Sequence, residues 1–166
     1  AKTVVPMGRP ISNGVDNSQL NFYIKFMDKK KACLCVNARR QAIKYWLKSS
    51  ANDWPVAQHL FEKKDYHYAL FFGHLTVEKI LKALYIDRCG TVPPFTHSLN
   101  LLAEKSSLKL TFEQNKLLET ITDFNIEARY PGDKFTFWKR CTSAYTKKYL
   151  SEIEGMKKWL LNQIRS

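Results

Sequence analysis

The most informative hydrophobic pattern lies in the middle of the chain, between Tyr66 and Asp87. Apolar residues there surround the helical circumference instead of following one stripe: Ala69, Leu70, Phe71, Phe72, Leu75, Val77, Ile80, Leu81, Ala83, Leu84 and Ile86. A helix that is apolar on nearly every side is packed by neighbours all round. The pattern therefore predicts a central helix over residues 66–87, about 33 Å long at ~1.5 Å per residue.

The segment before the central helix has a helical period of its own, from about Ala38 to Glu62. Pro55 lies inside this segment, and the apolar period resumes directly after it. We therefore expect one kinked helix instead of two separate ones. Residues 63–65 form a short link, so this helix and the central one should be antiparallel neighbours.

Three further helices are expected after the Pro- and Gly-containing stretch that follows the central helix. Thr96 should cap a short helix over residues 98–105. Thr111, with Gln114 three residues later, has the pattern of a capping box and should open a helix that ends near residues 127–128. A final apolar period predicts one more long helix in the C-terminal part of the chain.

The bounds expected for that last helix are Phe137 or Thr142 at its start and Ile164 at its end. The predicted fold class is all-α, an up-and-down four-helix bundle with one additional short helix and an irregular N-terminal arm. Proline, glycine and few large apolar residues mark residues 1–37 as that arm, and residues 38–166 as the bundle domain.

Composition narrows the class of partner. The chain has 166 residues and a formal net charge of +12, and residues 1–41 hold eight Lys/Arg against two Asp/Glu. A basic balance favours anionic partners such as nucleic acid, nucleotides or an acidic protein. No apolar run approaches the length of a membrane span, and the beginning of the sequence lacks the apolar core of a secretory signal.

The four cysteines are Cys33, Cys35, Cys89 and Cys141, and no pair of them has the CxxC spacing. We interpret them as reduced thiols of a cytoplasmic protein. The sequence predicts neither a cofactor nor a metal site, because one histidine and one glutamate a helical turn apart often occur by chance.

One polar stripe interrupts the central helix. His74, Glu78 and Lys82 follow each other at intervals of four residues and share a face, with Lys79 beside them. In one interpretation they form an ordinary Glu–Lys pair on the least buried edge, worth ~0.2–0.5 kcal/mol. In the other they are a partly buried polar cluster, kept for binding or for setting the register of the helices.

Residues 38–164 resemble a HEPN domain (higher eukaryotes and prokaryotes nucleotide-binding). The resemblance rests on four patches in the same order: Ala57–Phe61 (AQHLF), Glu78–Ala83 (EKILKA), Pro94–Leu99 (PFTHSL) and Glu127–Pro131 (EARYP). It implies a helical bundle that usually forms a homodimer and is often the partner of a minimal nucleotidyltransferase. Residues 1–37 lie outside it.

Many HEPN domains are metal-independent ribonucleases of toxin–antitoxin or related systems. They use an arginine followed, after four to six residues, by a histidine. No arginine of this sequence is followed by a histidine at that spacing. Without a placed imidazole, the ~10²–10⁴-fold contribution of general acid–base catalysis is missing. We therefore expect no catalytic residues of the family type.

The resemblance and the unexplained polar residues together suggest a non-catalytic domain that binds a nucleotide or supports a nucleotidyltransferase, within a toxin–antitoxin-type system. The residues expected to contact phosphate or to stack on a base are Lys79, Lys82, Arg129 and Tyr130. The residues expected to orient them are His74, Glu78 and His97. Two alternatives stay open: an RNA-cleaving toxin with a relocated pair such as His97 and Arg129, and a structural homodimerisation module.

Overall fold

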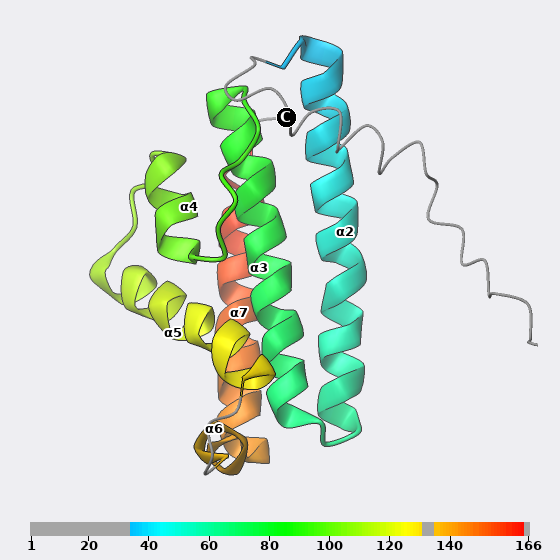
Figure 1. Ribbon diagram of the computed structural model, residues 1–166, viewed down its shortest axis with the longest axis vertical. Helices are drawn as coiled ribbons and strands as arrows, with labels where there is room; N and C mark the ends of the chain where they lie inside the picture. The colour runs from blue at the N-terminus through cyan, green and yellow to red at the C-terminus, as the bar shows by residue number, and fades with distance from the viewer. Residues whose placement is uncertain (1–33, 131–134, 165–166) are drawn as a thin grey trace, which may run out of the picture. The chain divides into compact units, whose positions relative to one another are not determined.

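The computed structural model describes residues 34–130 and 135–164. These residues form six helices and no strand (Figure 1): α2 (Val36–Glu62), α3 (Tyr66–Cys89), α4 (Leu99–Lys105), α5 (Phe112–Arg129), α6 (Thr136–Arg140) and α7 (Ser143–Leu161). The all-α prediction is confirmed. Four of these helices are long, α4 is the expected short helix, and the five-residue α6 adds another. The predicted irregular arm lies largely in residues 1–33, outside the described residues.

Helices α2 and α3 form an antiparallel hairpin (Figure 1). Helix α2 continues through Pro55, which confirms the prediction of one helix instead of two, and it begins two residues before the predicted position 38. At the other end of the hairpin, Gly90 caps α3 in the left-handed conformation with φ of 65°. Glycine adopts this conformation without steric cost, which is why helices commonly end on it. The carbonyl of Gly90 accepts a hydrogen bond of 2.8 Å from the backbone N–H of Leu34, just ahead of α2.

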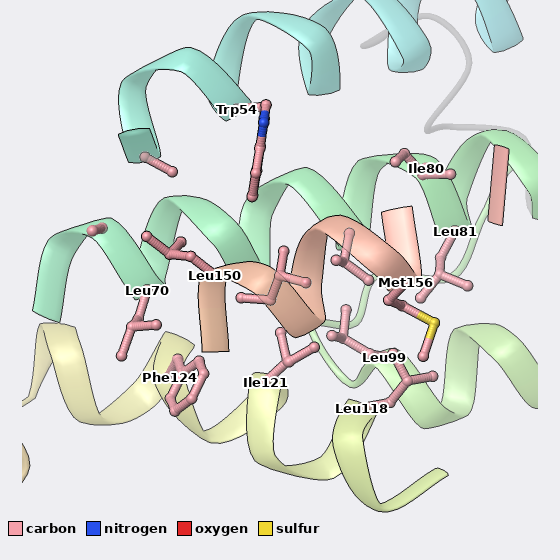
Figure 2. Close-up of a cluster of buried hydrophobic side chains, with 14 of the residues drawn as sticks. Trp54, Leu70, Ile80, Leu81, Leu99, Leu118, Ile121, Phe124, Leu150 and Met156 are labelled. Carbon is pink, nitrogen blue, oxygen red and sulfur yellow. The ribbon is translucent and has the colours of Figure 1, made fainter. Parts of the chain in front are cut away.

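Helix α3 is the central helix of the domain and packs against α2, α4, α5 and α7. Its buried residues occur on all sides, as its hydrophobic pattern predicted. All six described helices contribute side chains to the core, with Phe137 coming from α6. Figure 2 shows core residues from the other five: Trp54, Leu70, Leu81, Leu99, Leu118, Phe124, Leu150 and Met156. Helices α3 and α7 approach closely at Gly73, where a Cβ atom would lie 2.8 Å from Ile153 Cδ1.

Helix caps explain where the later helices begin. The prediction that Thr96 caps α4 is wrong: Ser98 is the cap, and its Oγ accepts from the backbone N–H of Leu101 at 3.3 Å. The Thr96 hydroxyl instead accepts from the N–H of Ser98 at 3.1 Å, which stabilises the turn ahead of the helix. Both residues have a hydroxyl, and the path of the loop decides which one reaches the free N–H groups of the first turn.

The predicted capping box of α5 is confirmed, with Thr111 and Gln114 each bonded to the other's backbone N–H. Of the two starts expected for the last helix, Thr142 is the cap of α7 and accepts from the N–H of Tyr145 at 3.3 Å. Phe137 belongs to the separate helix α6. Within the described part of the chain, no helix combines the length and apolar character needed to cross a membrane.

Candidate functional site

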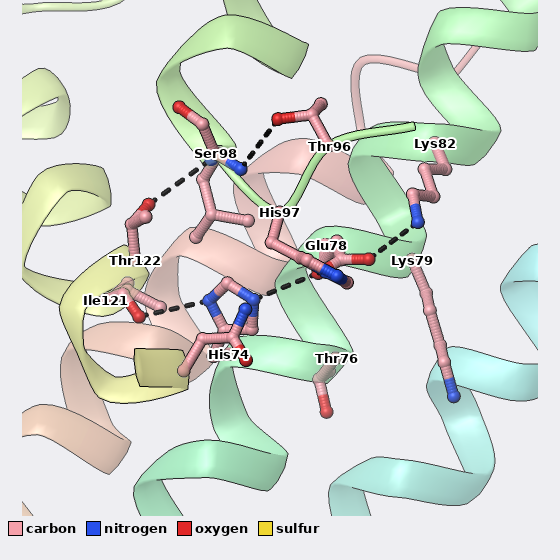
Figure 3. A network of polar contacts seen from close by, with 12 residues as sticks. His74, Thr76, Glu78, Lys79, Lys82, Thr96, His97, Ser98, Ile121 and Thr122 are labelled. Atoms are coloured by element: carbon pink, nitrogen blue, oxygen red, sulfur yellow. Dashed lines mark hydrogen bonds and ion pairs between the residues drawn. The ribbon is translucent and has the colours of Figure 1, made fainter. Parts of the chain in front are cut away.

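The polar stripe of α3 is a buried cluster centred on Glu78 (Figure 3). Glu78 is only 3% exposed, although a glutamate is seldom buried unless it is paired. Its carboxylate contacts His97 from the loop ahead of α4, and His74 and Lys82 of its own helix. The choice between an exposed edge and a buried cluster is thus decided in favour of the cluster.

His74 links the cluster to α5. Its ring is fully buried, with Nε2 3.0 Å from Glu78 Oε2 and Nδ1 3.0 Å from the backbone carbonyl oxygen of Ile121. Both ring nitrogens are therefore engaged, one within α3 and one across the helix interface. This double contact sets the orientation of the imidazole.

His97 and Lys82 complete the contacts of the carboxylate. His97, from the loop ahead of α4, places Nδ1 2.9 Å from Glu78 Oε2, and its side chain is 50% exposed. Lys82 places Nζ 2.6 Å from Glu78 Oε1 and 4.9 Å from the centre of the Trp46 ring in α2. The cluster thus joins α2, α3, α5 and the α4 loop, and His97 is its most accessible member.

These neighbours keep the carboxylate charged. Burial by itself would raise the pKa of the Glu78 carboxyl group. The hydrogen bonds from the two histidines and from Lys82, with the positive charge of Lys82, outweigh burial and lower the pKa to about 2. Glu78 is therefore ionised at neutral pH.

Not all of the predicted site residues belong to this cluster. Lys79 turns toward α2, where its Nζ lies 2.5 Å from Asp53 Oδ2. Figure 3 shows its side chain directed away from the Glu78 carboxylate. Successive residues of a helix project about 100° apart, and this rotation sends Lys79 to a different neighbour from Glu78.

Arg129 and Tyr130 lie at the end of α5. Arg129 Nε donates to the carbonyl of Asn125 at 2.9 Å, and its guanidinium carbon lies 5.4 Å from the Tyr130 ring centre and 5.8 Å from that of Phe71. Phe71 precedes Lys82 by eleven residues on α3, which corresponds to ~16 Å along the helix. The structure therefore brings together His74, Glu78, Lys82 and His97, and leaves Arg129 with Tyr130 as a separate exposed group.

Two aromatic neighbours of the cluster were not singled out from the sequence. Trp46 lies within the apolar period of the first helix, and only the tertiary contact with Lys82 gives it a further role. Phe95 is 92% exposed, and its ring centre lies 6.2 Å from that of His97. An aromatic residue directly after two prolines in a loop was the available signal for it.

The fold and the cluster define a helical-bundle domain with a buried polar centre that opens to solvent through a histidine. Comparison with protein families matches residues 43–163 to the HEPN domain. The match covers most of the chain, and the chain therefore belongs to the HEPN domain family. Neither a curated protein nor a solved structure gave a match.

Proposed function

We propose that this chain is a non-catalytic HEPN domain that binds a nucleotide, with Lys82 and His97 toward the phosphates and Phe95 beneath the base. The observation that carries the proposal is the arrangement around His97. An ammonium group and a half-exposed imidazole contact the two oxygens of one carboxylate, and an almost fully exposed aromatic ring lies beside the imidazole. Family membership supports the ligand class.

Each of the three groups has capacity left for a ligand. An ammonium group has three N–H donors, and one of those of Lys82 is used by Glu78. The Nε2 atom of His97 has no hydrogen bond to any residue within 34–130 or 135–164, since only Nδ1 contacts Glu78. An exposed aromatic ring can stack on any base, at ~1–3 kcal/mol per base.

Arg129 and Tyr130 enter the proposal as a second contact, for a longer ligand than a mononucleotide. Their distance along the domain from Lys82 is the reason for treating them separately. The guanidinium is exposed, and among the described residues it donates only from Nε, to Asn125.

The arrangement favours binding over RNA cleavage. The family's Arg–His spacing is absent from the sequence. The relocated pair weighed as an alternative, His97 with Arg129, has its members engaged at different places: His97 with Glu78, and Arg129 with Asn125. Neither residue contacts the other in the described structure, so no general acid–base pair supports the ribonuclease alternative.

Calorimetric titration with ATP and with inorganic triphosphate tests the proposal. Lys82→Gln should weaken the binding of both ligands. Phe95→Ala should weaken the binding of ATP by about 5- to 150-fold, the equivalent of ~1–3 kcal/mol of stacking, and leave the binding of triphosphate unchanged. No heat with either ligand would refute nucleotide binding.

The matched control is Lys158→Gln. Lys158 also pairs with a glutamate four residues earlier, at 3.0 Å from Glu154, but on the exposed face of α7. Lys158→Gln should leave both affinities unchanged. If it weakens binding as much as Lys82→Gln does, the binding is a general attraction between opposite charges and not a specific site. Incubation with RNA is the companion measurement: cleavage that His97→Ala abolishes would replace the proposal with the ribonuclease function.

The assembly forms part of the proposal too. We expect a homodimer that serves as the partner or substrate-binding subunit of a minimal nucleotidyltransferase, and this expectation is supported by the family alone. Light scattering of the purified chain tests the dimer. Co-purification with a nucleotidyltransferase encoded beside it tests the partner, and a lone monomer in both measurements would contradict this part.

A further inference from the structure

Three potential metal ligands converge in the cluster. His74 and Glu78 are one turn apart on α3, and His97 is brought to them by the α4 loop. One ligand atom from each residue lies within 4.8 Å of the other two. The sequence predicted no metal site because His74 and Glu78 alone are a common pair, and the third group becomes visible only in the folded chain.

The hydrogen bonds of His74 leave a position that a cation would fill. Its Nδ1 faces the Ile121 carbonyl oxygen, which only accepts hydrogen bonds, so Nδ1 must hold a proton. Its Nε2 faces an oxygen of Glu78, and a carboxylate also only accepts. A neutral imidazole has a single N–H, so the contact between Nε2 and Glu78 requires a further positive centre, either a proton or a metal ion.

From this geometry we propose that His74 Nε2, Glu78 Oε2 and His97 Nδ1 bind a Zn²⁺ ion. Metal-bound histidines typically donate the other ring N–H to a carbonyl or carboxylate, as His74 does to Ile121. Two imidazoles and one carboxylate form a donor set suited to Zn²⁺, and three protein ligands leave a fourth position open.

The distances show what movement this coordination requires. With ~2.1 Å from Zn²⁺ to each ligand atom, tetrahedral ligands lie about 3.4 Å apart. The Glu78 oxygen now lies 3.0 Å from His74 Nε2 and 2.9 Å from His97 Nδ1. Each histidine nitrogen must move a few tenths of an ångström away from the Glu78 oxygen. The two histidine nitrogens, which lie within 4.8 Å of each other, must come to about 3.4 Å, and the half-exposed His97 on its loop is the group able to move.

Lys82 does not occupy the metal position. It contacts Oε1 of Glu78, whereas both histidines face Oε2. The carboxylate can thus hold Lys82 with one oxygen and the metal with the other. The open coordination position lies on the side of His97, where solvent enters the cluster. The inference does not depend on nucleotide binding, and its test contains no nucleotide.

The experiment uses the full chain with Cys33, Cys35 and Cys89 changed to serine, so that the buried Cys141 is the one thiol left in the chain. After treatment with a chelator, the protein is titrated with Co²⁺, followed by its visible spectrum, and then with Zn²⁺ in competition. We expect one equivalent to bind, with the intense visible bands of four-coordinate Co²⁺. Zn²⁺ should also raise the melting temperature by mass action.

His97→Ala is the decisive variant, because a half-exposed loop residue can be replaced without loss of the fold. It should weaken binding by at least about 100-fold, since losing even an outer hydrogen-bond partner of a metal ligand costs ~10–100-fold. The matched control is His59→Ala, an exposed histidine of α2, which should bind as the parent does. Absence of binding, binding that survives His97→Ala, or equal loss in both variants would each overturn the metal site.

Discussion

The closest approach of α3 and α7 provides a sharp test of the packing. At Gly73, an added Cβ atom would lie 2.8 Å from Cδ1 of Ile153, a side chain that is fully buried. At Gly155, also inside a helix, an added Cβ atom would meet nothing within 4 Å. Replacing each glycine by alanine therefore makes the same chemical change in a filled and in an empty place.

The magnitudes follow from two opposing effects. Alanine is favoured over glycine inside a helix by ~1 kcal/mol, and Gly155→Ala should gain most of it. In Gly73→Ala, the Ile153 methyl must retreat by about 0.6 Å to reach an ordinary contact of 3.4 Å. Overpacking of a close-packed core costs ~1–3 kcal/mol. We expect the free energy of unfolding of Gly73→Ala to lie ~1–3 kcal/mol below that of Gly155→Ala.

Urea unfolding followed by circular dichroism measures these differences. A double-mutant cycle with Ile153→Val assigns the cost to a single atom, because valine lacks Cδ1. Ile153→Val alone should cost ~0.5–1.5 kcal/mol, and in the Gly73→Ala background it should cost less or stabilise.

Two results would refute this account of the packing. One is a Gly73→Ala protein as stable as Gly155→Ala. The other is an Ile153→Val cost that is the same in both backgrounds, which would show that the added methyl does not press on Cδ1.

Two further predictions concern a thiol and a helix cap. Burial raises the pKa of the Cys141 thiol to about 12, from an ordinary value of 9.0, so its thiolate fraction at pH 8 is reduced by about 1000-fold. Iodoacetamide should therefore label the exposed Cys35 and Cys89 in the folded chain and reach Cys141 only after unfolding, as peptide mass spectrometry would show; rapid labelling of Cys141 would contradict its burial. Thr111→Ala, which removes the capping box of α5, should lower the free energy of unfolding in urea by ~1 kcal/mol. The comparison is Thr120→Ala in the middle of α5, where the hydroxyl of this partly buried residue bonds, within the described chain, only to the Lys116 carbonyl one turn earlier, and it should change the free energy of unfolding by less than ~0.5 kcal/mol.

The elements of this fold were readable from local pattern. The all-round apolar character of α3 predicted its central place, and the resumption of the apolar period after Pro55 predicted one continuous helix. The capping box of α5 needs only residues three positions apart, so the sequence contained all of it. At the start of α4, two neighbouring hydroxyl residues could serve as the cap, and the path of the loop decided which of them does.

The site needed the tertiary structure. Helical spacing placed His74, Glu78 and Lys82 on one face, and that part depends only on the 3.6-residue period. Whether this face is buried, and which residues from other elements reach it, depends on how the helices are rotated against each other and where the loops run.

The sequence by itself therefore determined the four long helices and α4, the central position of α3 and the family. Only the folded chain brought His97 to Glu78 across nineteen positions of sequence, turned Lys79 to Asp53, and set Arg129 apart. The physical reason is that a periodic pattern specifies directions around one helix axis, whereas contacts between helices depend on packing that no single segment encodes.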